Sequence, residues 1–197
     1  MLIEFNEELI NIIHNYVVTR LTANEGIVYS GTVSGCIRKV FTAIYGEKKY
    51  GSLHEKAGAI LYSLVNGHSF TDGNKRTGLL TTCLFLYYNG LYLKVPPDCA
   101  KYLECMADAQ NPNAPTEPDA IEWVKKYAEK SLFSRATNFI YSLGYRTLGK
   151  DYLAQTTKTI LERDVIPYLD QKKLIDYELL KMRREKWKKR SSNSNSG

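Results

Sequence analysis

Apolar residues recur every three or four positions along most of the chain, and this spacing predicts amphipathic α-helices. The first predicted helix begins after Asn6, a capping residue that precedes two acidic residues, Glu7 and Glu8, which suit the positive end of a helix. A second helix is predicted to follow a loop over residues 22–31 and to end at Gly46. The apolar positions of these two helices are Leu9, Ile12, Ile13, Tyr16 and Val17, then Val33, Ile37, Val40, Phe41 and Ile44.

Start and stop signals are clearest in the middle of the chain. Ser52 and Glu55 have the spacing of a capping box, in which each side chain satisfies a free backbone amide at a helix start. Before them, residues 46–51 form a polar segment bounded by glycines, which indicates a loop or a short hairpin. The further predicted elements are helices over 53–66 and 77–88, an extended segment over 92–95, and helices from 96 to about 110 and from 116 to about 132.

The pattern loosens beyond Ser131. The elements predicted there are short helices over 134–142 and 151–165, an interruption at Pro167 and a last helix over 169–187. We therefore predict an all-α protein in three parts. These are a helical domain over residues 1–132, a helical C-terminal extension over 133–190, and a tail over 191–197 that contains only Ser, Asn and Gly and is expected to be disordered.

The 197 residues include 27 Lys and Arg against 21 Asp and Glu, but the net charge of +6 is confined to one end. Residues 1–180 hold 20 residues of each sign, whereas residues 181–197 hold seven basic residues and one acid. A basic surface over the whole body, which is typical of nucleic-acid-binding domains, is therefore not expected. A solvated helix end is the first interpretation of the basic run, and binding to RNA, ribosome or an acidic partner is the alternative. The run comprises Lys181, Arg183, Arg184, Lys186, Lys188, Lys189 and Arg190.

Composition favours a globular protein of the cytoplasm. The hydrophobic fraction of 44% and the charged fraction of 24% are ordinary for a folded domain. The N-terminus has acids and no basic region, so it does not resemble a signal peptide. The longest uncharged run, residues 77–93, contains Thr81, Thr82 and a turn, and is too weak for a membrane span. Four cysteines lack metal-site spacing and are expected to be buried reduced thiols: Cys36, Cys83, Cys99 and Cys105.

One loop before a predicted helix carries the residues with the most chemical information. Such a loop presents free backbone amides and the positive end of a helix dipole, which together can bind an anion. Gly73 allows a tight turn, and Lys75 and Arg76 add two positive charges suited to phosphate. Asp72 is expected to hold Mg²⁺ against phosphate, and the imidazole of His68 suits proton transfer near neutral pH. These parts predict transfer from a nucleoside triphosphate to a hydroxyl group.

The same loop also has a purely structural interpretation. Asp-Gly-Asn is a common turn sequence, and a Lys-Arg pair at a helix start is often only solvated. A lone His after a glycine often lies at the surface, so the residues by themselves leave both interpretations open. The other two histidines, His14 and His54, are interpreted as structural or surface residues.

The order of the loop residues resembles the Fic/Doc family motif, His-x-Phe-x-Asp/Glu-Gly/Ala-Asn-x-Arg. The similarity extends over about residues 1–132, with further likeness at 50–62 and 85–90. It implies the Fic fold, a helical bundle with a short flap hairpin, and a transferase activity. The residues that match the motif are His68, Phe70, Asp72, Gly73, Asn74 and Arg76.

Two positions resemble the death-on-curing (Doc) branch of this family. Lys75 stands where the Fic branch has a glycine of an anion hole, and Leu79 stands where that branch has a later Arg. The Doc branch implies phosphoryl transfer from ATP or another NTP to a Ser, Thr or Tyr hydroxyl of a protein. Protein AMPylation by the same site is the alternative that the Fic branch implies. A non-catalytic binding module with a basic nucleic-acid-binding tail is a third hypothesis.

The resemblance implies a role for each site residue. His68 would be the base, Asp72 the Mg²⁺ ligand and Phe70 a core residue that fixes the loop. On the flap over residues 46–51, target contacts are expected from Lys48, Lys49 and Tyr50. By the same resemblance, we expect a toxin paired with an antitoxin and a translation protein such as elongation factor Tu as its target. The nucleotide phosphates would be bound by Gly73, Asn74, Lys75 and Arg76.

Overall fold

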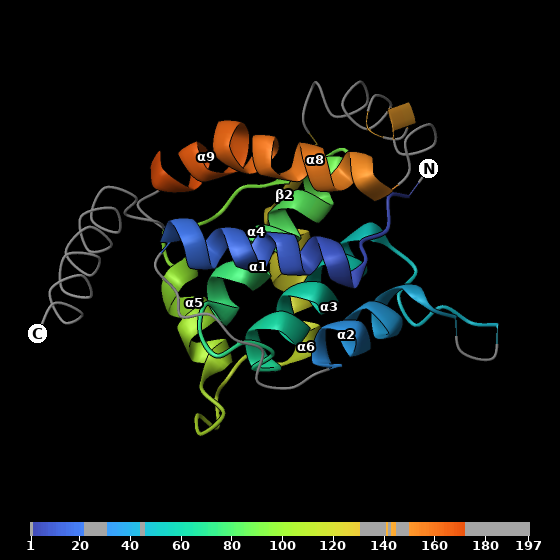
Figure 1. Ribbon diagram of the computed structural model, residues 1–197. Helices are drawn as coiled ribbons and strands as arrows, with labels where there is room; N and C mark the ends of the chain where they lie inside the picture. The colour runs from blue at the N-terminus through green and yellow to red at the C-terminus, as the bar shows by residue number, and fades with distance from the viewer. Residues whose placement is uncertain are drawn as a thin grey trace, which may run out of the picture.

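The chain is almost entirely helical wherever the computed structural model describes it, and the all-α prediction is confirmed (Figure 1). The described residues are 2–21, 31–43, 46–130, 141, 143–144 and 150–171. In Figure 1, α8 and α9 lie on one side of α1, and α2, α3 and α6 lie on the other. The helical elements are α1 Glu7–Leu21, α2 Thr32–Phe41, α3 Leu53–Asn66, α4 Asn74–Tyr88, α5 Cys99–Ala107, α6 Glu117–Tyr127, α8 Lys150–Ile160, the π-helical turn Leu161–Val165 and α9 Ile166–Gln171.

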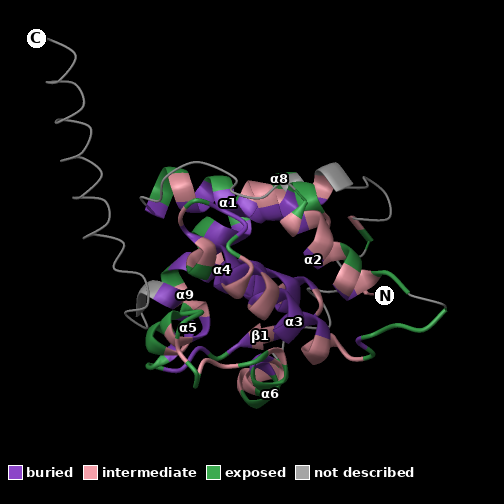
Figure 2. Ribbon diagram, turned by 90° about the horizontal axis from the view of Figure 1, so that it is seen from below, coloured by how far each residue is buried: buried purple, intermediate pink, exposed green. Residues whose placement is uncertain are grey.

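Helix α4 is the centre of the hydrophobic core (Figure 2). It contacts α1, α3, α5 and β1, so neighbours surround it on several sides. A helix buried in this way must be apolar around most of its circumference, and α4 carries no charged residue after Arg76. The fully buried apolar side chains of α4 are Leu80, Leu84, Phe85, Leu86 and Tyr88.

The predicted helix starts at Asn6 and Ser52 are confirmed. The side-chain oxygen of Asn6 accepts a hydrogen bond from the amide of Leu9 at 2.9 Å. At the start of α3, the Glu55 amide donates to the Ser52 hydroxyl at 3.2 Å, and the Ser52 amide donates to the Glu55 carboxylate at 2.8 Å. These local contacts were readable from sequence because each joins residues three positions apart.

The predicted helix over 116–132 is wrong at its C-terminal end. Helix α6 ends at Tyr127, and the chain continues as strand β2, Ala128–Lys130, which pairs antiparallel with β1, Leu91–Leu93. The amide of Lys94 extends this pairing by donating to the carbonyl oxygen of Tyr127 at 2.8 Å. The strand forms because residues 128–130 pair with β1. The helical spacing of the sequence could not predict it, because that partner lies far away along the chain.

Three other helix ends differ from the prediction. Helix α4 begins at Asn74 rather than at residue 77, because its first turn is polar and lacks the apolar residues from which the start was predicted. Helix α5 is shorter than predicted, since its first residues after Pro96 form a turn in which the Cys99 amide donates to the Pro96 carbonyl. Helix α2 ends at Phe41 rather than continuing toward Gly46.

Pro167 does not interrupt the C-terminal helical run, contrary to the prediction. It is the second residue of α9 and follows a π-helical turn, in which the Ile166 amide donates to the Leu161 carbonyl. Proline has no amide to donate to the preceding turn, and the wider π-helical turn before Pro167 accommodates that missing hydrogen bond while the run stays helical. The predictions for residues 134–140 and for the chain beyond residue 171 lie outside the described residues.

The C-terminal helices are attached to α4 by tyrosine hydroxyl groups. The Tyr88 hydroxyl lies 3.0 Å from those of Thr156 and Thr157, and the Tyr87 hydroxyl donates to Asp164 at 3.0 Å. Burial accounts for most of the rise in the pKa of Tyr88 to about 12, so this hydroxyl stays protonated. The extension is therefore part of the same packed body as α4.

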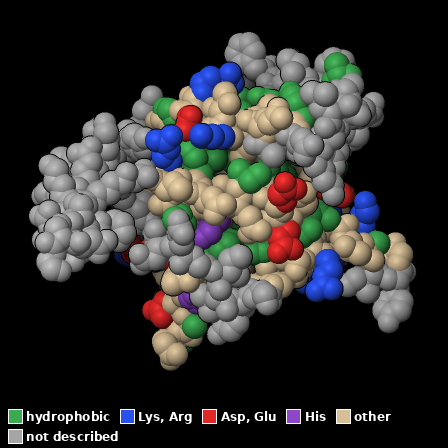
Figure 3. Space-filling view, viewed as in Figure 1, with side chains coloured by type: hydrophobic (Ala, Val, Ile, Leu, Met, Phe, Trp, Pro, Cys, Tyr) green, Lys and Arg blue, Asp and Glu red, His purple; other side chains and the backbone are tan. Residues whose placement is uncertain are grey.

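The surface of the described residues has no dominant charge. Basic and acidic side chains are interspersed on the face shown in Figure 3, and Arg20 of α1 pairs with Glu162 at 3.5 Å. The basic run at 181–190 lies outside the described residues. Within the described ranges, no helix is long and apolar enough to cross a membrane. All four cysteines are free, as predicted; Cys36, Cys83 and Cys99 are buried, whereas Cys105 is only half-buried.

Two glycines allow helices to approach α3 closely. A Cβ atom at Gly58 would lie 2.5 Å from the Cα of Ile121 on α6, and one at Gly78 would lie 2.7 Å from Cγ2 of Val65. Glycine within a helix lowers helix stability, so these residues are explained by packing rather than by propensity. Gly78 in particular sets the spacing between α3 and α4, which flank the loop described below.

We expect Gly58→Ala to lower the free energy of unfolding by about 1–3 kcal/mol, because the new methyl group meets backbone atoms that cannot move away. Gly35→Ala in α2 is the matched control, since its Cβ would meet no atom within 4 Å. This control should raise the free energy of unfolding by about 0.5–1 kcal/mol through the better helix propensity of alanine. Urea unfolding followed by circular dichroism measures both, and a loss of stability in both variants would contradict the packing argument.

Candidate active site

The loop between α3 and α4, residues 67–73, contains two residues with positive φ. Gly73 has φ 79° directly before α4, a conformation that glycine adopts readily. His68 has φ 44°, and it is the one non-glycine residue with positive φ in the described ranges. Such a backbone costs about 1–3 kcal/mol and tends to occur at functional sites. The His68 side chain is exposed and makes no hydrogen bond within the described residues.

Phe70 and Asn74 hold this loop in place. The Phe70 side chain is 1% exposed, as expected for a residue that fixes the loop in the core. The side chain of Asn74 bridges the backbone of Phe70: its oxygen accepts from the Phe70 amide at 2.9 Å and its nitrogen donates to the Phe70 carbonyl at 2.7 Å. The structure thus places the Asn74 amide on the loop itself, whereas a phosphate contact was expected from the sequence.

The first turn of α4 has free backbone amides. No side chain caps the helix at Gly73, and the first helical hydrogen bond in this turn runs from the Thr77 amide to the Gly73 carbonyl at 2.8 Å. The preceding amides, including that of Lys75, therefore have no partner within the helix and can bind an anion. The Lys75 side chain is exposed in the same turn, where it adds a full positive charge.

Arg76 and Asp72 form an ion pair at the start of α4. Their closest nitrogen and oxygen atoms are 3.7 Å apart, and Arg76 also donates a hydrogen bond to the carbonyl of Leu21 at the end of α1. The Asp72 carboxylate accepts from the Gly73 amide at 2.5 Å and remains 41% exposed. One exposed carboxylate fits Mg²⁺ that is also bound by phosphate, and no cluster of three or more potential metal ligands occurs in the described residues.

A pocket lies between α4 and α5, next to these cations. Its floor is apolar, with Leu80 and Cys99 buried, whereas Lys75, Ala100 and Glu104 are exposed at its rim. Leu79, which the sequence marked as a departure from the Fic branch, faces this pocket. The complete lining is Lys75, Arg76, Leu79, Leu80, Cys99, Ala100, Leu103 and Glu104.

His14 of α1 supports the loop from inside, which the sequence showed only in part. Its ring stacks on Phe70 with 3.6 Å between ring centres, and its Nδ1 lies 3.1 Å from the Thr77 hydroxyl. The side chain is 4% exposed, so the structural interpretation of His14 is confirmed. Its contact with the motif was missed, because Thr77 lies 63 positions further along the chain. The only signal was its place beside the apolar stripe of α1.

The three flap residues expected to contact a target are placed differently from one another. Lys48 is exposed, whereas Tyr50 is 3% exposed. Lys49 and the Tyr50 hydroxyl both contact Glu117 of α6, at 3.3 Å and 2.5 Å. The structure therefore makes Tyr50 an anchor of the flap, and Lys48 is the flap residue most open to a partner.

Comparison with known proteins agrees with this arrangement of loop and helix. Residues 4–86 match the model of the Fic/DOC family, a range that includes α1 to most of α4 and the whole loop over 67–73. This segment is therefore similar to the Fic/Doc family, and the helical fold of the described residues is the one that the sequence predicted.

One relative is similar to this chain over about half of its length. Toxin Doc of Mycolicibacterium smegmatis is 29% identical over 92 residues, which cover 47% of this chain and 71% of the relative.

We expect the stability of the protein to fall as the pH decreases below 6.5, the usual pKa of histidine. Burial lowers the pKa of His14, against a smaller opposite effect from Asp72, so the unfolded chain takes up a proton that the folded protein does not. His14→Phe keeps an aromatic ring on Phe70 and should make the free energy of unfolding less dependent on pH between about pH 7 and 5.

Thr77→Val is the control for this prediction, because it removes the hydrogen bond and leaves the imidazole. It should lower stability by about 1 kcal/mol at every pH without flattening the pH dependence. Urea unfolding at several pH values measures both variants. An unchanged pH slope in His14→Phe would show that His14 does not titrate as described.

Proposed function

We propose that this protein transfers the terminal phosphoryl group of ATP, or of another NTP, to a Ser, Thr or Tyr hydroxyl group of a protein substrate. The placement of Lys75 carries the proposal. Its ammonium group is exposed at the uncapped start of α4, at the rim of the pocket and one turn after the His68 loop. A full charge at this position favours the terminal phosphate, where a glycine would leave room for a phosphate to sit deeper.

The proposed reaction needs a base and a phosphate site, and the loop offers both. His68 takes the proton of the substrate hydroxyl as its oxygen bonds to the γ-phosphorus. The bond from that phosphorus to the bridging oxygen breaks, and the nucleoside diphosphate leaves with the electron pair. The free amides at the start of α4, with Lys75 and Arg76, bind the phosphate oxygens on which negative charge is spread.

In this proposal the nucleobase end of the nucleotide would lie against the pocket between α4 and α5. The apolar floor suits a nucleobase, and Lys75 and Arg76 at one side suit the phosphates. Asp72 would hold Mg²⁺, which neutralises phosphate charge when it is bound. For Arg76 to reach a phosphate it would exchange its contact with Asp72, an exchange that Mg²⁺ at Asp72 would favour.

The toxin role is proposed from the Doc relative. A toxin needs a partner that restrains it, so we propose a separate antitoxin, and a translation protein such as elongation factor Tu as the target. Binding of the basic residues from Lys181 to Arg190 to RNA or an acidic partner stays a prediction. Protein AMPylation is the alternative reaction, and the label experiment below separates it from phosphoryl transfer.

We expect a target incubated with ATP and Mg²⁺ to gain label from [γ-³²P]ATP and not from [α-³²P]ATP. His68→Ala should lower the rate of transfer by about 10²–10⁴-fold, the usual contribution of a general base. The fold should be unchanged, because the His68 side chain is exposed and its replacement by alanine removes no packing contact. Label from the α-phosphate would establish AMPylation instead, and full activity of His68→Ala would exclude His68 as the base.

We expect Ala100→Trp to weaken nucleotide binding by about tenfold or more, because the indole would fill the pocket from its exposed rim. Lys101→Trp is the matched control, since Lys101 is the next residue of α5, is exposed and does not line the pocket. Titration with a fluorescent ATP analogue measures both variants. Equal affinities would place the nucleotide elsewhere.

A further inference from the structure

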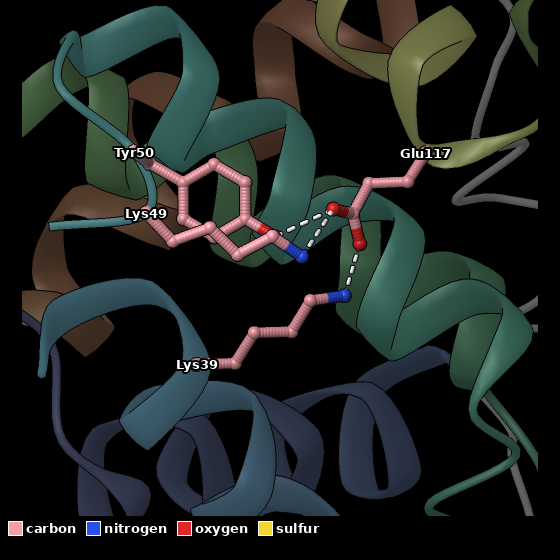
Figure 4. A network of polar contacts seen from close by, with 4 residues as sticks. All are labelled: Lys39, Lys49, Tyr50 and Glu117. Atoms are coloured by element: carbon pink, nitrogen blue, oxygen red, sulfur yellow. Dashed lines mark hydrogen bonds and ion pairs between the residues drawn. The ribbon is translucent and has the colours of Figure 1, made fainter. Parts of the chain in front are cut away.

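One carboxylate joins the flap to two helices of the body. Glu117, at the start of α6, accepts a hydrogen bond from the Tyr50 hydroxyl at 2.5 Å and lies 3.3 Å from the Lys49 ammonium. It also pairs with the ammonium of Lys39 in the last turn of α2. Figure 4 shows Lys39, Lys49 and Tyr50 converging on this carboxylate, and we call the four residues the Glu117 cluster.

A buried lysine joins the same two segments through their backbone. The ammonium of Lys56, on α3, donates to the carbonyl oxygen of Tyr50 at 2.5 Å and to that of Val40 at 3.3 Å. Lys56 is only 4% exposed. Burial, with the charge of Lys48, lowers the pKa of Lys56, and Glu4 and Glu55 oppose this shift.

Both contacts act at the two ends of one segment. The Glu117 cluster holds Lys39 at one end and Lys49 with Tyr50 at the other. Lys56 holds the neighbouring carbonyls, those of Val40 and Tyr50. The described residues on the two sides of this segment, Val40 and Tyr50, are therefore both held to the body by one anion and one cation.

This arrangement costs more than an apolar anchor would. Burying a charge requires desolvation, and well-packed apolar side chains often give equal or greater stability. Burial raises the pKa of Glu117, but hydrogen bonds from Lys39 and Tyr50 and the neighbouring charges lower it below its usual value, so the carboxylate is ionised at neutral pH. Hydrogen bonds between charged groups are directional, so they fix the orientation of the flap relative to α2 and α6.

A further contact holds the C-terminal end of the flap, where the Gly51 amide donates to the Glu55 carboxylate at 2.9 Å. Residues 46–49 are all exposed, and Tyr50 is the first buried residue after them. The orientation of the exposed part is therefore determined at its ends. The contacts of Glu117 and Lys56 at these ends therefore determine the direction in which the flap points.

We propose that Glu117 and Lys56 are positioning residues that hold the flap in the orientation needed to bind the protein substrate. The inference rests on the proposed function, because it assumes that the flap contacts the segment of the protein substrate that carries the accepting hydroxyl. Neither residue lines the nucleotide pocket, so their effect falls on the protein substrate and not on ATP. A pre-organised flap lowers the entropy cost of docking, which appears in KM for the protein substrate.

The test compares Glu117→Ala and Glu117→Gln with Glu122→Gln. Glu117→Gln keeps an acceptor for the Tyr50 hydroxyl and loses the charge. Glu122→Gln is the matched control, because Glu122 is also on α6, is exposed and pairs only within the helix, with Lys125 at 2.7 Å. Tyr50→Phe removes the hydroxyl and retains the buried ring, so it probes the same contact from the flap side.

Three measurements are made on the full chain. For Glu117→Ala we expect KM for the protein substrate to rise by about tenfold with kcat changed less than about twofold. Glu117→Gln and Tyr50→Phe should give intermediate rises, and Glu122→Gln should match the original protein. Affinity for a fluorescent ATP analogue should be the same in all. Trypsin cleavage after Lys48 and Lys49 should be faster in Glu117→Ala at equal global stability.

Each outcome separates this inference from the proposed function. Absence of transfer by the unsubstituted protein would overturn the proposed function, and the docking role with it, while the trypsin result would still report on the anchor. Transfer with unchanged KM in Glu117→Ala, or a change confined to kcat or ATP affinity, would overturn the positioning role alone. If Glu117→Ala fails to fold, Tyr50→Phe and Glu117→Gln decide the question by the same KM comparison.

Discussion

The packing of α4 against α3 is the contact on which the site depends. Gly78 lets Val65 approach closely, so the end of α3 and the start of α4 are held together and the loop between them has little freedom. Phe70 fills the core beneath the loop, His14 stacks on Phe70, and Asn74 bridges its backbone. A strained φ at His68 persists because these neighbours over-determine the loop.

Charge in this protein acts locally. The net excess lies in the last residues of the chain, whereas the candidate site at the start of α4 combines a few cations with one carboxylate. Around the flap, a second balanced set joins one anion, Glu117, to Lys39 and Lys49. In both places the arrangement of opposite charges, rather than their sum, fixes how the side chains lie: Arg76 against Asp72 at α4, and Lys39 and Lys49 against Glu117 at the flap.

Sequence was sufficient wherever the relevant contact was local. The caps at Asn6 and Ser52 join residues three positions apart, and the helix that Ser52 begins has the predicted ends. It failed where a partner is distant: Ala128–Lys130 pairs with Leu91–Leu93 as a strand, although its own sequence continues a helical pattern. In sequence Glu117 is an ordinary acid in the first turn of α6, and only folding brought Tyr50 to it, 67 positions away.

The sequence by itself determined the helical class and the identity and order of the loop residues, because periodicity, caps and a short motif are written in neighbouring positions. The tertiary structure decided what those residues can reach. It placed Asn74 on the loop backbone, His14 beneath Phe70, Tyr50 in an anchor and Lys75 at an open pocket. These roles depend on burial and on contacts between distant segments, which only the packed core creates.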